Sequence, residues 1–300
     1  MMGVSFDELR QVCQRPVAYG NDVAGLLFGD KASLPITKLL IDCGWSPNIA
    51  TVGMLVTGVI GAALQPFGPL AAVLGAASLV LYYILDCVDG EVARYRKIEH
   101  ARWGYYEYIF HFIVKPSAYL GVGVSLWRLD GQVIWLFAAL SAGLSTLWLK
   151  LFMAVPSLVF SGAVLGRGAS GKRPWRDYAD EAVERAAREE ANEVAQSVAP
   201  GADREVFKLR ANLSTLRALL TNFDVGLALL LVFSIIEWSV GPVSLSWLGG
   251  LSLRGLWLVW YGLILPLDFI DYLRTFVRKR HFDAEMVRML ARAHRFRLPE

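Results

Sequence analysis

The feature that most constrains this chain is a series of six apolar runs, each roughly 20 residues long. They cover approximately residues 49–65, 68–86, 104–126, 132–154, 223–242 and 247–273. A helix of about 20 apolar residues crosses the roughly 30 Å hydrocarbon layer of a bilayer. The hydrophobic content of 55% and the mean hydropathy of +0.42 agree with this interpretation. The sequence therefore predicts an all-α integral membrane protein with six transmembrane helices.

The basic residues are concentrated in alternate connections between the runs. Those connections contain Arg94, Arg96, Lys97 and Arg102 after the second run, and Arg167, Lys172, Arg173 and Arg176 after the fourth. Because Lys and Arg are enriched in the cytoplasmic loops of membrane proteins, we expect both termini and the 86–102 bridge to face the cytoplasm. The predicted location is a bacterial-type inner membrane, crossed several times.

Five segments follow from this pattern. They are a cytoplasmic N-terminal and interfacial region (1–48), a first membrane part (49–165), a cytoplasmic helical insert (166–221), a second membrane part (222–273) and a basic tail (274–300). From Leu34 the first segment is apolar at helical spacing, which is typical of a helix lying on the membrane surface. The insert is rich in Ala, Glu and Arg, which favours a helix with a solvated face.

Charge and cysteine content exclude two classes of protein. The net charge is only +3, whereas a nucleic-acid partner requires a concentrated basic surface, so none is expected. The three cysteines, Cys13, Cys43 and Cys87, lack CxxC spacing. We expect them to be reduced and structural rather than part of a disulfide framework.

Ionisable residues lie where the second apolar run ends and the third begins. Charges at such positions are costly and are functional hypotheses by default. Asp86 and Asp89 share a helical face at i, i+3, so their carboxylates can converge on a hard cation such as Mg²⁺. Gly90 and Ala93 keep the neighbouring surface small, which allows a ligand to approach closely.

A second polar stripe lies on the third run. Glu107, His111 and Lys115 are spaced at i, i+4 and i+8, and therefore lie on one face of an otherwise apolar helix. Two facing helices with polar stripes are typical of a metal site in a helix bundle.

The residues from Asp86 to Arg94 resemble the signature of the CDP-alcohol phosphotransferase (CDP-alcohol phosphatidyltransferase) family. That signature reads D-x-x-D-G-x-x-A-R-(x8)-G-x-x-x-D-x-x-x-D, and its first half is matched at Asp86, Asp89, Gly90, Ala93 and Arg94. The resemblance implies six spans, a site for two divalent metals, Mg²⁺ or Mn²⁺, around the diphosphate of a CDP-linked donor, and a homodimer. It covers most of the membrane part and not the 166–221 insert.

The second half of the signature departs from the family. Counting from Asp86, the third and fourth acidic positions fall on Glu107 and His111, and the glycine position falls on Trp103. The resemblance makes Asp86, Asp89 and Glu107 the metal ligands. His111 then occupies the position of the base that deprotonates the acceptor hydroxyl, a task that histidine side chains commonly perform at neutral pH. Alternatives are a structural hydrogen bond with Glu107 and a loss of catalysis.

Several other residues are candidates for substrate binding. Arg94 is expected to face phosphate or pair with a carboxylate, with a positive-inside anchor as its alternative. Lys115 would contact phosphate or form an ion pair with Glu107 or with another span. Lys150 would contact phosphate or extend to the membrane surface. The resemblance adds Gly90, Ala93, Asn48 and Thr51 to this set.

The expected activity is transfer of a substituted phosphate group from a CDP-linked donor to an alcohol or lipid acceptor, with release of CMP, in phospholipid or glycan-headgroup synthesis. One alternative is a family member that acts on an unusual CMP-activated sugar, polyol or phosphonate. A second is a non-catalytic membrane scaffold that binds a partner through its insert. Metal-dependent release of CMP separates the enzymes from the scaffold.

Overall fold

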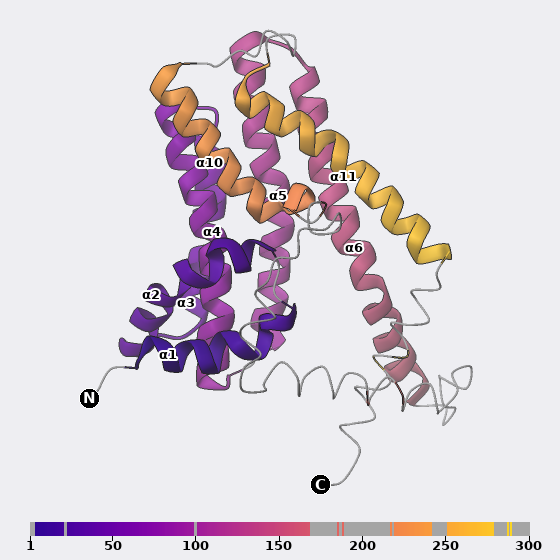
Figure 1. The fold of residues 1–300 in the computed structure, drawn as a ribbon. Helices are drawn as coiled ribbons and strands as arrows, with labels where there is room; N and C mark the ends of the chain where they lie inside the picture. Colours follow the sequence, from indigo (N-terminus) through magenta and orange to yellow (C-terminus); the bar gives the residue numbers. More distant parts are fainter. Residues whose placement is uncertain are drawn as a thin grey trace. The chain divides into compact units, whose positions relative to one another are not determined.

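The computed structural model describes residues 4–20, 23–98, 101–168, 219–241 and 251–278, together with positions 185, 188, 217, 287 and 289. These residues form helices and no strand (Figure 1). Five helices are long and apolar enough to cross a membrane: α4 (Pro69–Arg96), α5 (Ala101–Asp130), α6 (Ile134–Gly168), α10 (Phe223–Val240) and α11 (Leu253–Arg278). By length and composition, the chain is an all-α, multi-pass membrane protein, as its sequence predicts.

The first predicted span corresponds to a shorter helix, α3 (Asn48–Leu64). Its 17 residues rise about 25 Å, because each residue adds about 1.5 Å. That length is below the roughly 30 Å of a bilayer core. Helix α3 is apolar but is not one of the five long helices.

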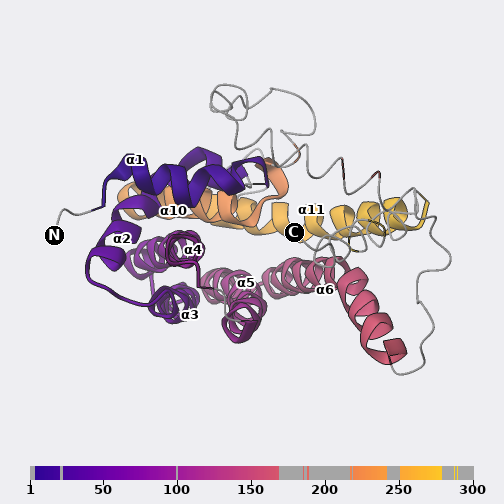
Figure 2. The same cartoon turned by 90° about the horizontal axis from the view of Figure 1, so that it is seen from below.

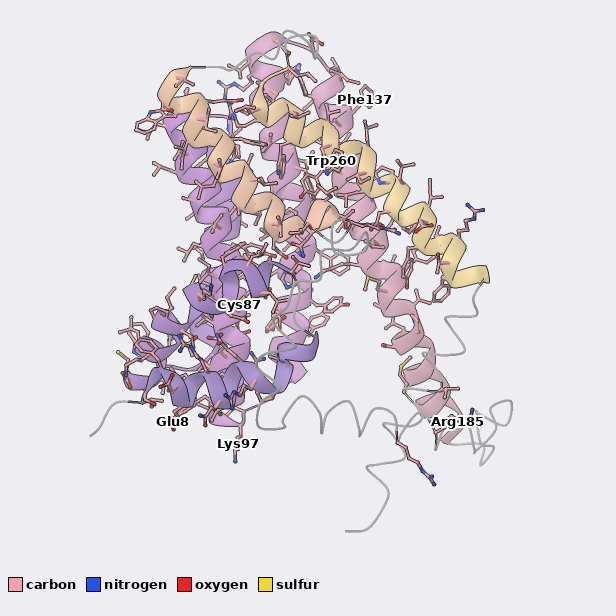
Figure 3. The ribbon with its side chains drawn as sticks, in the orientation of Figure 1. Glu8, Cys87, Lys97, Phe137, Arg185 and Trp260 are labelled. Atoms are coloured by element: carbon pink, nitrogen blue, oxygen red, sulfur yellow. The ribbon has the colours of Figure 1, made fainter. Side chains whose placement is uncertain are left out.

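Helix α4 continues well beyond the predicted end of the second span at residue 86. It runs for 28 residues to Arg96, so Asp86 and Asp89 lie within one unbroken helix. The helix stops at Lys97, whose φ of 53° places it in the left-handed region. Figure 3 shows the Lys97 side chain pointing away from the end of α4. The bridge to α5 is therefore much shorter than the sequence predicts.

The described residues belong to two compact units. The first contains residues 1–146 and 203–266, and the second contains residues 147–202 and 267–300. The core of the first unit is aromatic, since Tyr82, Tyr119, Trp257 and Tyr261 are all buried in one apolar cluster. In the second unit, Phe152 of α6 packs edge to face against Phe269 of α11.

Helix α3 packs closely against α4, and the two lie side by side in the view from below (Figure 2). A Cβ atom on Gly61 would lie 2.8 Å from the carbonyl oxygen of Gly75, and one on Gly75 would lie 2.7 Å from that of Gly61. Only glycine permits this approach of two helix backbones. Helix α3 also contacts α5, and a Cβ on Gly121 would lie 2.3 Å from the carbonyl oxygen of Ala62.

The N-terminal region packs on α4 through short helical pieces. They are α1 (Phe6–Leu9), η1 (Arg10–Gln14), η2 (Arg15–Gly20), η3 (Gly25–Gly29) and α2 (Asp30–Asp42). Helix α2 confirms the helix predicted from Leu34 and begins four residues earlier.

A buried ion pair joins three helices where α10 ends and α11 begins. Arg254 donates from Nε to Glu237 over 2.6 Å and from a terminal nitrogen to the Ser125 hydroxyl over 3.2 Å. The backbone N–H of Arg254 donates to the other oxygen of Glu237. This network fixes α5, α10 and α11 to one another.

Two predicted segments lie almost wholly outside the described residues. They are the 166–221 insert and the basic tail beyond Arg278. Within the insert, the structure describes only the end of α6, three arginines and residues 219–221. Their predicted helical and membrane-surface characters stay predictions.

Candidate metal centre

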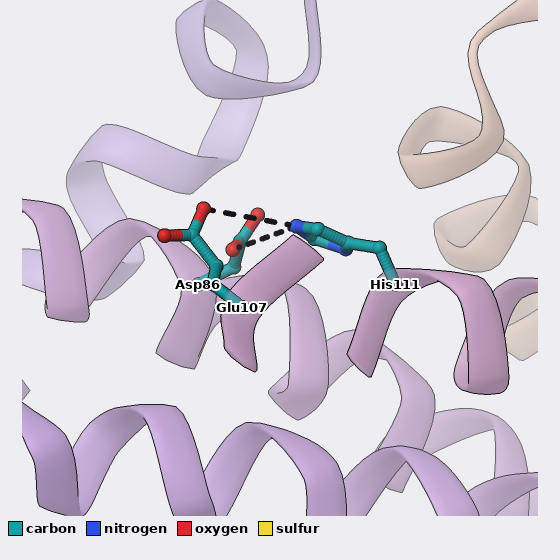
Figure 4. Close-up of side chains that lie close together, drawn as sticks. All are labelled: Asp86, Glu107 and His111. Atoms are coloured by element: carbon teal, nitrogen blue, oxygen red, sulfur yellow. Dashed lines mark ion pairs between the residues drawn. The ribbon is translucent and has the colours of Figure 1, made fainter. Parts of the chain in front are cut away.

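Three side chains from two helices converge in the first unit. The Nε2 atom of His111 lies 3.3 Å from Oδ1 of Asp86 and 3.9 Å from Oε1 of Glu107 (Figure 4). One ligand atom from each residue lies within 4.8 Å of the other two. Asp86 and Glu107 are partly exposed, whereas only 8% of His111 is accessible. Solvent therefore reaches the cluster at its two carboxylates, whereas the imidazole is buried.

The helices explain this convergence. Glu107 and His111 lie one turn apart on α5, so both side chains project from the same face. Asp86 projects from α4, and α3 contacts both of these helices. Helix α3 thus holds α4 and α5 where one carboxylate and one imidazole can meet. The sequence prediction that residues of the second and third runs come together is supported at Asp86, Glu107 and His111.

Tyr82 contacts the opposite nitrogen of the same imidazole. Its hydroxyl makes a hydrogen bond with Nδ1 of His111, and the two rings pack edge to face at 5.8 Å. Tyr82 is fully buried and lies one turn before Asp86 on α4. The sequence analysis missed this residue, although its i, i+4 spacing from Asp86 was a usable signal.

Asp89 lies beside the three-residue cluster without belonging to it. A side-chain hydrogen bond joins Asp89 to Thr51 of α3, and the charges of Asp86 and Glu107 act on it. Thr51 is completely buried. The structure thus brings Thr51, a predicted substrate residue, to Asp89, a predicted metal ligand. Asp89 is not one of the three residues whose ligand atoms lie within 4.8 Å of one another.

Arg94 binds the N-terminal region of the chain. Its Nε donates to the backbone carbonyl of Cys13 over 2.6 Å. Its guanidinium lies against Gly90, where an added Cβ would be 2.9 Å from a terminal nitrogen. The charge of Arg94 also acts on Asp89. Arg94 is therefore held at the edge of the cluster by a backbone contact that the sequence did not predict.

Lys115 pairs with a residue of another helix. Its Nζ lies 3.7 Å from Oδ2 of Asp224 on α10 and 4.9 Å from the centre of the Phe223 ring. Among the predicted alternatives, this geometry favours an ion pair with another span. The sequence patterns did not identify Asp224, although an acid two residues after Asn222, a typical helix-capping residue, was visible.

Glu91 is a second buried acid that the sequence analysis did not single out. Only 2% of it is accessible, and its carboxylate accepts hydrogen bonds from Gln14, Ser33 and Thr37. All three donors are neutral and belong to the N-terminal region. Glu91 therefore fastens that region to α4, directly beside the turn that carries Asp89.

The remaining predicted residues lie on three different helices. Ala93 is on α4, and its carbonyl accepts from Ile98 where the helix ends. Asn48 is the first residue of α3, and its backbone N–H donates to the Ser46 hydroxyl. Lys150 lies on α6 in the second compact unit. Phosphate contacts at these positions stay predictions.

The donor set fits a divalent cation. Two carboxylates and one imidazole supply two oxygen ligands and one nitrogen ligand, a mixture that suits Mn²⁺ and other transition metals better than Mg²⁺. Asp86, Glu107 and His111 are the residues positioned to hold such an ion, with Asp89 beside them.

The fold and this cluster define an all-α, multi-pass membrane protein with a candidate divalent-cation site between two of its helices. No known family model matches the chain, and no curated protein matches it either.

Proposed function

We propose that the protein is a CDP-alcohol phosphotransferase of the membrane. The observation that carries the proposal is the convergence of Asp86, Glu107 and His111 from two apolar helices. Their spacing, with Asp89, Gly90, Ala93 and Arg94, resembles the signature of that family. Phosphoryl-type transfer requires little covalent chemistry from the protein and depends on positioning and charge neutralisation, which such a cluster can provide.

In the proposed reaction, the acceptor hydroxyl attacks the phosphorus that carries the donor's alcohol. A new P–O bond forms to the acceptor, and the P–O bond to CMP breaks, so that CMP leaves with the bonding electrons. The hydroxyl proton passes to Nε2 of His111. The resemblance implies two ions per site, Mg²⁺ or Mn²⁺, which would neutralise the charge of the diphosphate.

The chain's own residues supply binding and orientation. Asp86, Asp89 and Glu107 would hold the cations, which leaves Nε2 of His111 for the acceptor proton, and Thr51 orients Asp89 through its hydrogen bond. Arg94, at the edge of the cluster, contacts the donor phosphate through the guanidinium nitrogens that Cys13 does not engage. The partial exposure of Asp86 and Glu107 supports access for donor and acceptor.

The membrane arrangement is part of the proposal. Helix α3 would serve as a sixth, shorter span, and α2 would lie on the membrane surface. The basic residues at and beyond the ends of α4 and α6 support cytoplasmic termini and a cytoplasmic site in a bacterial-type inner membrane. The insert would form a cytoplasmic helical segment, and the resemblance favours a homodimer.

The test uses purified full-length protein with a panel of CDP-linked donors and a membrane lipid extract. We expect Mg²⁺- or Mn²⁺-dependent release of CMP, and a product identified by mass. Asp89→Asn should abolish that release, whereas Asp7→Asn, which neutralises an exposed acid of α1, should leave it unchanged. Normal turnover by the Asp89→Asn protein contradicts the assignment.

The same panel separates the alternatives. Release of CMP only from sugar, polyol or phosphonate donors identifies the unusual-headgroup enzyme. If no donor yields metal-dependent CMP while the cellular role survives substitution of His111, the protein is a scaffold.

A further inference from the structure

The His111 ring is held on both of its nitrogens. Nδ1 makes a hydrogen bond with the Tyr82 hydroxyl, and Nε2 faces Asp86 at 3.3 Å and Glu107 at 3.9 Å. Tyr82 and Asp86 are four residues apart on α4, and one turn of helix rises about 5.4 Å. The imidazole from α5 therefore bridges a single turn of α4.

Burial makes the Tyr82 contact selective. Tyr82 and its neighbours Met54, Leu79 and Val114 are fully buried in one apolar cluster. A buried polar atom without a partner costs about 1 to 3 kcal/mol. Turning the ring over would exchange nitrogen for carbon at both contacts, so Nδ1 would lose Tyr82 while Nε2 would lose Asp86. The hydroxyl thus favours one orientation of the ring.

Hydrogen-bond partners of this kind fix the orientation of functional histidine rings. In metal sites, their loss typically costs about 10- to 100-fold in activity or metal affinity.

We propose that Tyr82 is a positioning residue for His111, because its hydroxyl keeps Nε2 directed at the carboxylates of Asp86 and Glu107. The proposal rests on the proposed function of His111 as the base of the transfer. Tyr82 itself is fully buried, so it would act on the reaction through His111.

The kinetic test is a double-mutant cycle on purified full-length protein. Tyr82→Phe should lower kcat about 10- to 100-fold and change KM for the CDP-linked donor by less than about 2-fold. In a His111→Gln background, the same substitution should change kcat by less than about 2-fold, because the contact is already lost. Tyr119→Phe is the control, since Tyr119 is equally buried and its ring packs on Trp257. Equal losses from Tyr82→Phe in both backgrounds overturn the proposal.

A second measurement does not depend on activity. The chain has four histidines, and nitrogen NMR of protein labelled with [¹⁵N]histidine reports the ring environment of each. The signals of His111 are those that His111→Gln removes. We expect one set of His111 signals in the wild type, and a second set from the turned ring after Tyr82→Phe. An unchanged His111 spectrum in Tyr82→Phe overturns the proposal. Absence of CMP release in every protein instead refutes the enzymatic function alone.

Discussion

The Nε2 atom of His111 lies 3.3 Å from Oδ1 of Asp86, although the two residues belong to different helices. This contact joins the helix that carries the matched half of the signature to the helix that carries its divergent half. It places a nitrogen atom where the family pattern has a carboxylate. The first two predictions concern the consequences of that exchange.

Substitution of His111 separates a base from a metal ligand. If His111 acts as the base, His111→Gln should lower kcat about 10²- to 10⁴-fold, the usual range for general-base catalysis. Binding of Mn²⁺ should change little, because Asp86, Asp89 and Glu107 keep their carboxylates. Mn²⁺ affinity is measured by electron paramagnetic resonance alongside CMP release. A parallel fall in Mn²⁺ affinity would instead make His111 a ligand.

Glu107 differs from the aspartate of the family pattern by one methylene group. Glu107→Gln should weaken Mn²⁺ binding strongly, because it removes the negative charge. Glu107→Asp keeps the charge and shortens the reach, so its Mn²⁺ affinity should be intermediate between those of Glu107→Gln and the wild type. Calorimetric titration with Mn²⁺ measures all three proteins. Equal affinities in Glu107→Gln and the wild type would exclude Glu107 from the ligand set.

Glu91 should contribute to stability rather than to metal binding. Glu91→Leu removes the acceptor that Gln14, Ser33 and Thr37 share. Gln14 and Ser33 keep the Asp30 carbonyl, whereas the fully buried Thr37 hydroxyl loses its carboxylate partner at a cost of about 1 to 3 kcal/mol. The N-terminal region should then be released from α4. Limited tryptic cleavage after the exposed Lys31 of α2, followed by mass spectrometry, measures that release.

The matched control for Glu91 is Asp7→Leu, since Asp7 forms an exposed ion pair with Arg10. Exposed pairs contribute little to stability. Its cleavage rate should equal that of the wild type. A wild-type rate in Glu91→Leu would show that the three hydrogen bonds do not hold the N-terminal region.

The buried pair of Glu237 and Arg254 gives a prediction that is independent of the metal centre. Glu237→Leu leaves the Arg254 charge buried and unpaired, which typically costs about 3 to 5 kcal/mol. Removing both charges in Glu237→Leu/Arg254→Leu should restore much of that loss. Apparent Tm in detergent measures both proteins, and a double variant less stable than the single one would contradict the argument.

The cysteines should differ in reactivity. Cys13 is fully buried, and burial raises the pKa of its thiol to about 11, whereas Cys43 is exposed. Thiolate is the reactive form, so Cys13 labelling at pH 7 to 8 is suppressed and would increase only as the pH rises towards 11. Brief treatment with a maleimide at pH 7.5, followed by peptide mass analysis, should find Cys43 modified and Cys13 unmodified. Equal labelling of both would contradict the structure around Cys13.

Local periodicity explains what could be predicted from the sequence. The i, i+4 spacing of Glu107 and His111 and the apolar runs depend on residues close together in the chain. The spacing and five of the six predicted runs agree with the structure, whereas the first run corresponds to the shorter helix α3. The extension of α4 to Arg96 was missed because its last turns are polar, and hydropathy marks the membrane boundary rather than the helix end.

Contacts between distant segments could not be predicted in the same way. Periodicity identifies the face of a helix that is polar and does not say which other helix that face meets. The partners of Glu91 lie in the N-terminal region, and the partner of Lys115 lies on α10. Each of these contacts depends on which segments are neighbours in the fold. The spacing of residues within one apolar run does not determine that.

The glycine contact between α3 and α4 has a consequence for the tolerance of this protein to substitution. Gly61 and Gly75 set the separation of the two backbones at its minimum, and Thr51 reaches Asp89 across the same pair of helices. A larger residue at position 61 would push the helices apart and lengthen that reach. The proposed activity would then be lost while every ionisable side chain of the cluster is intact, so it depends on two residues that have no side chain.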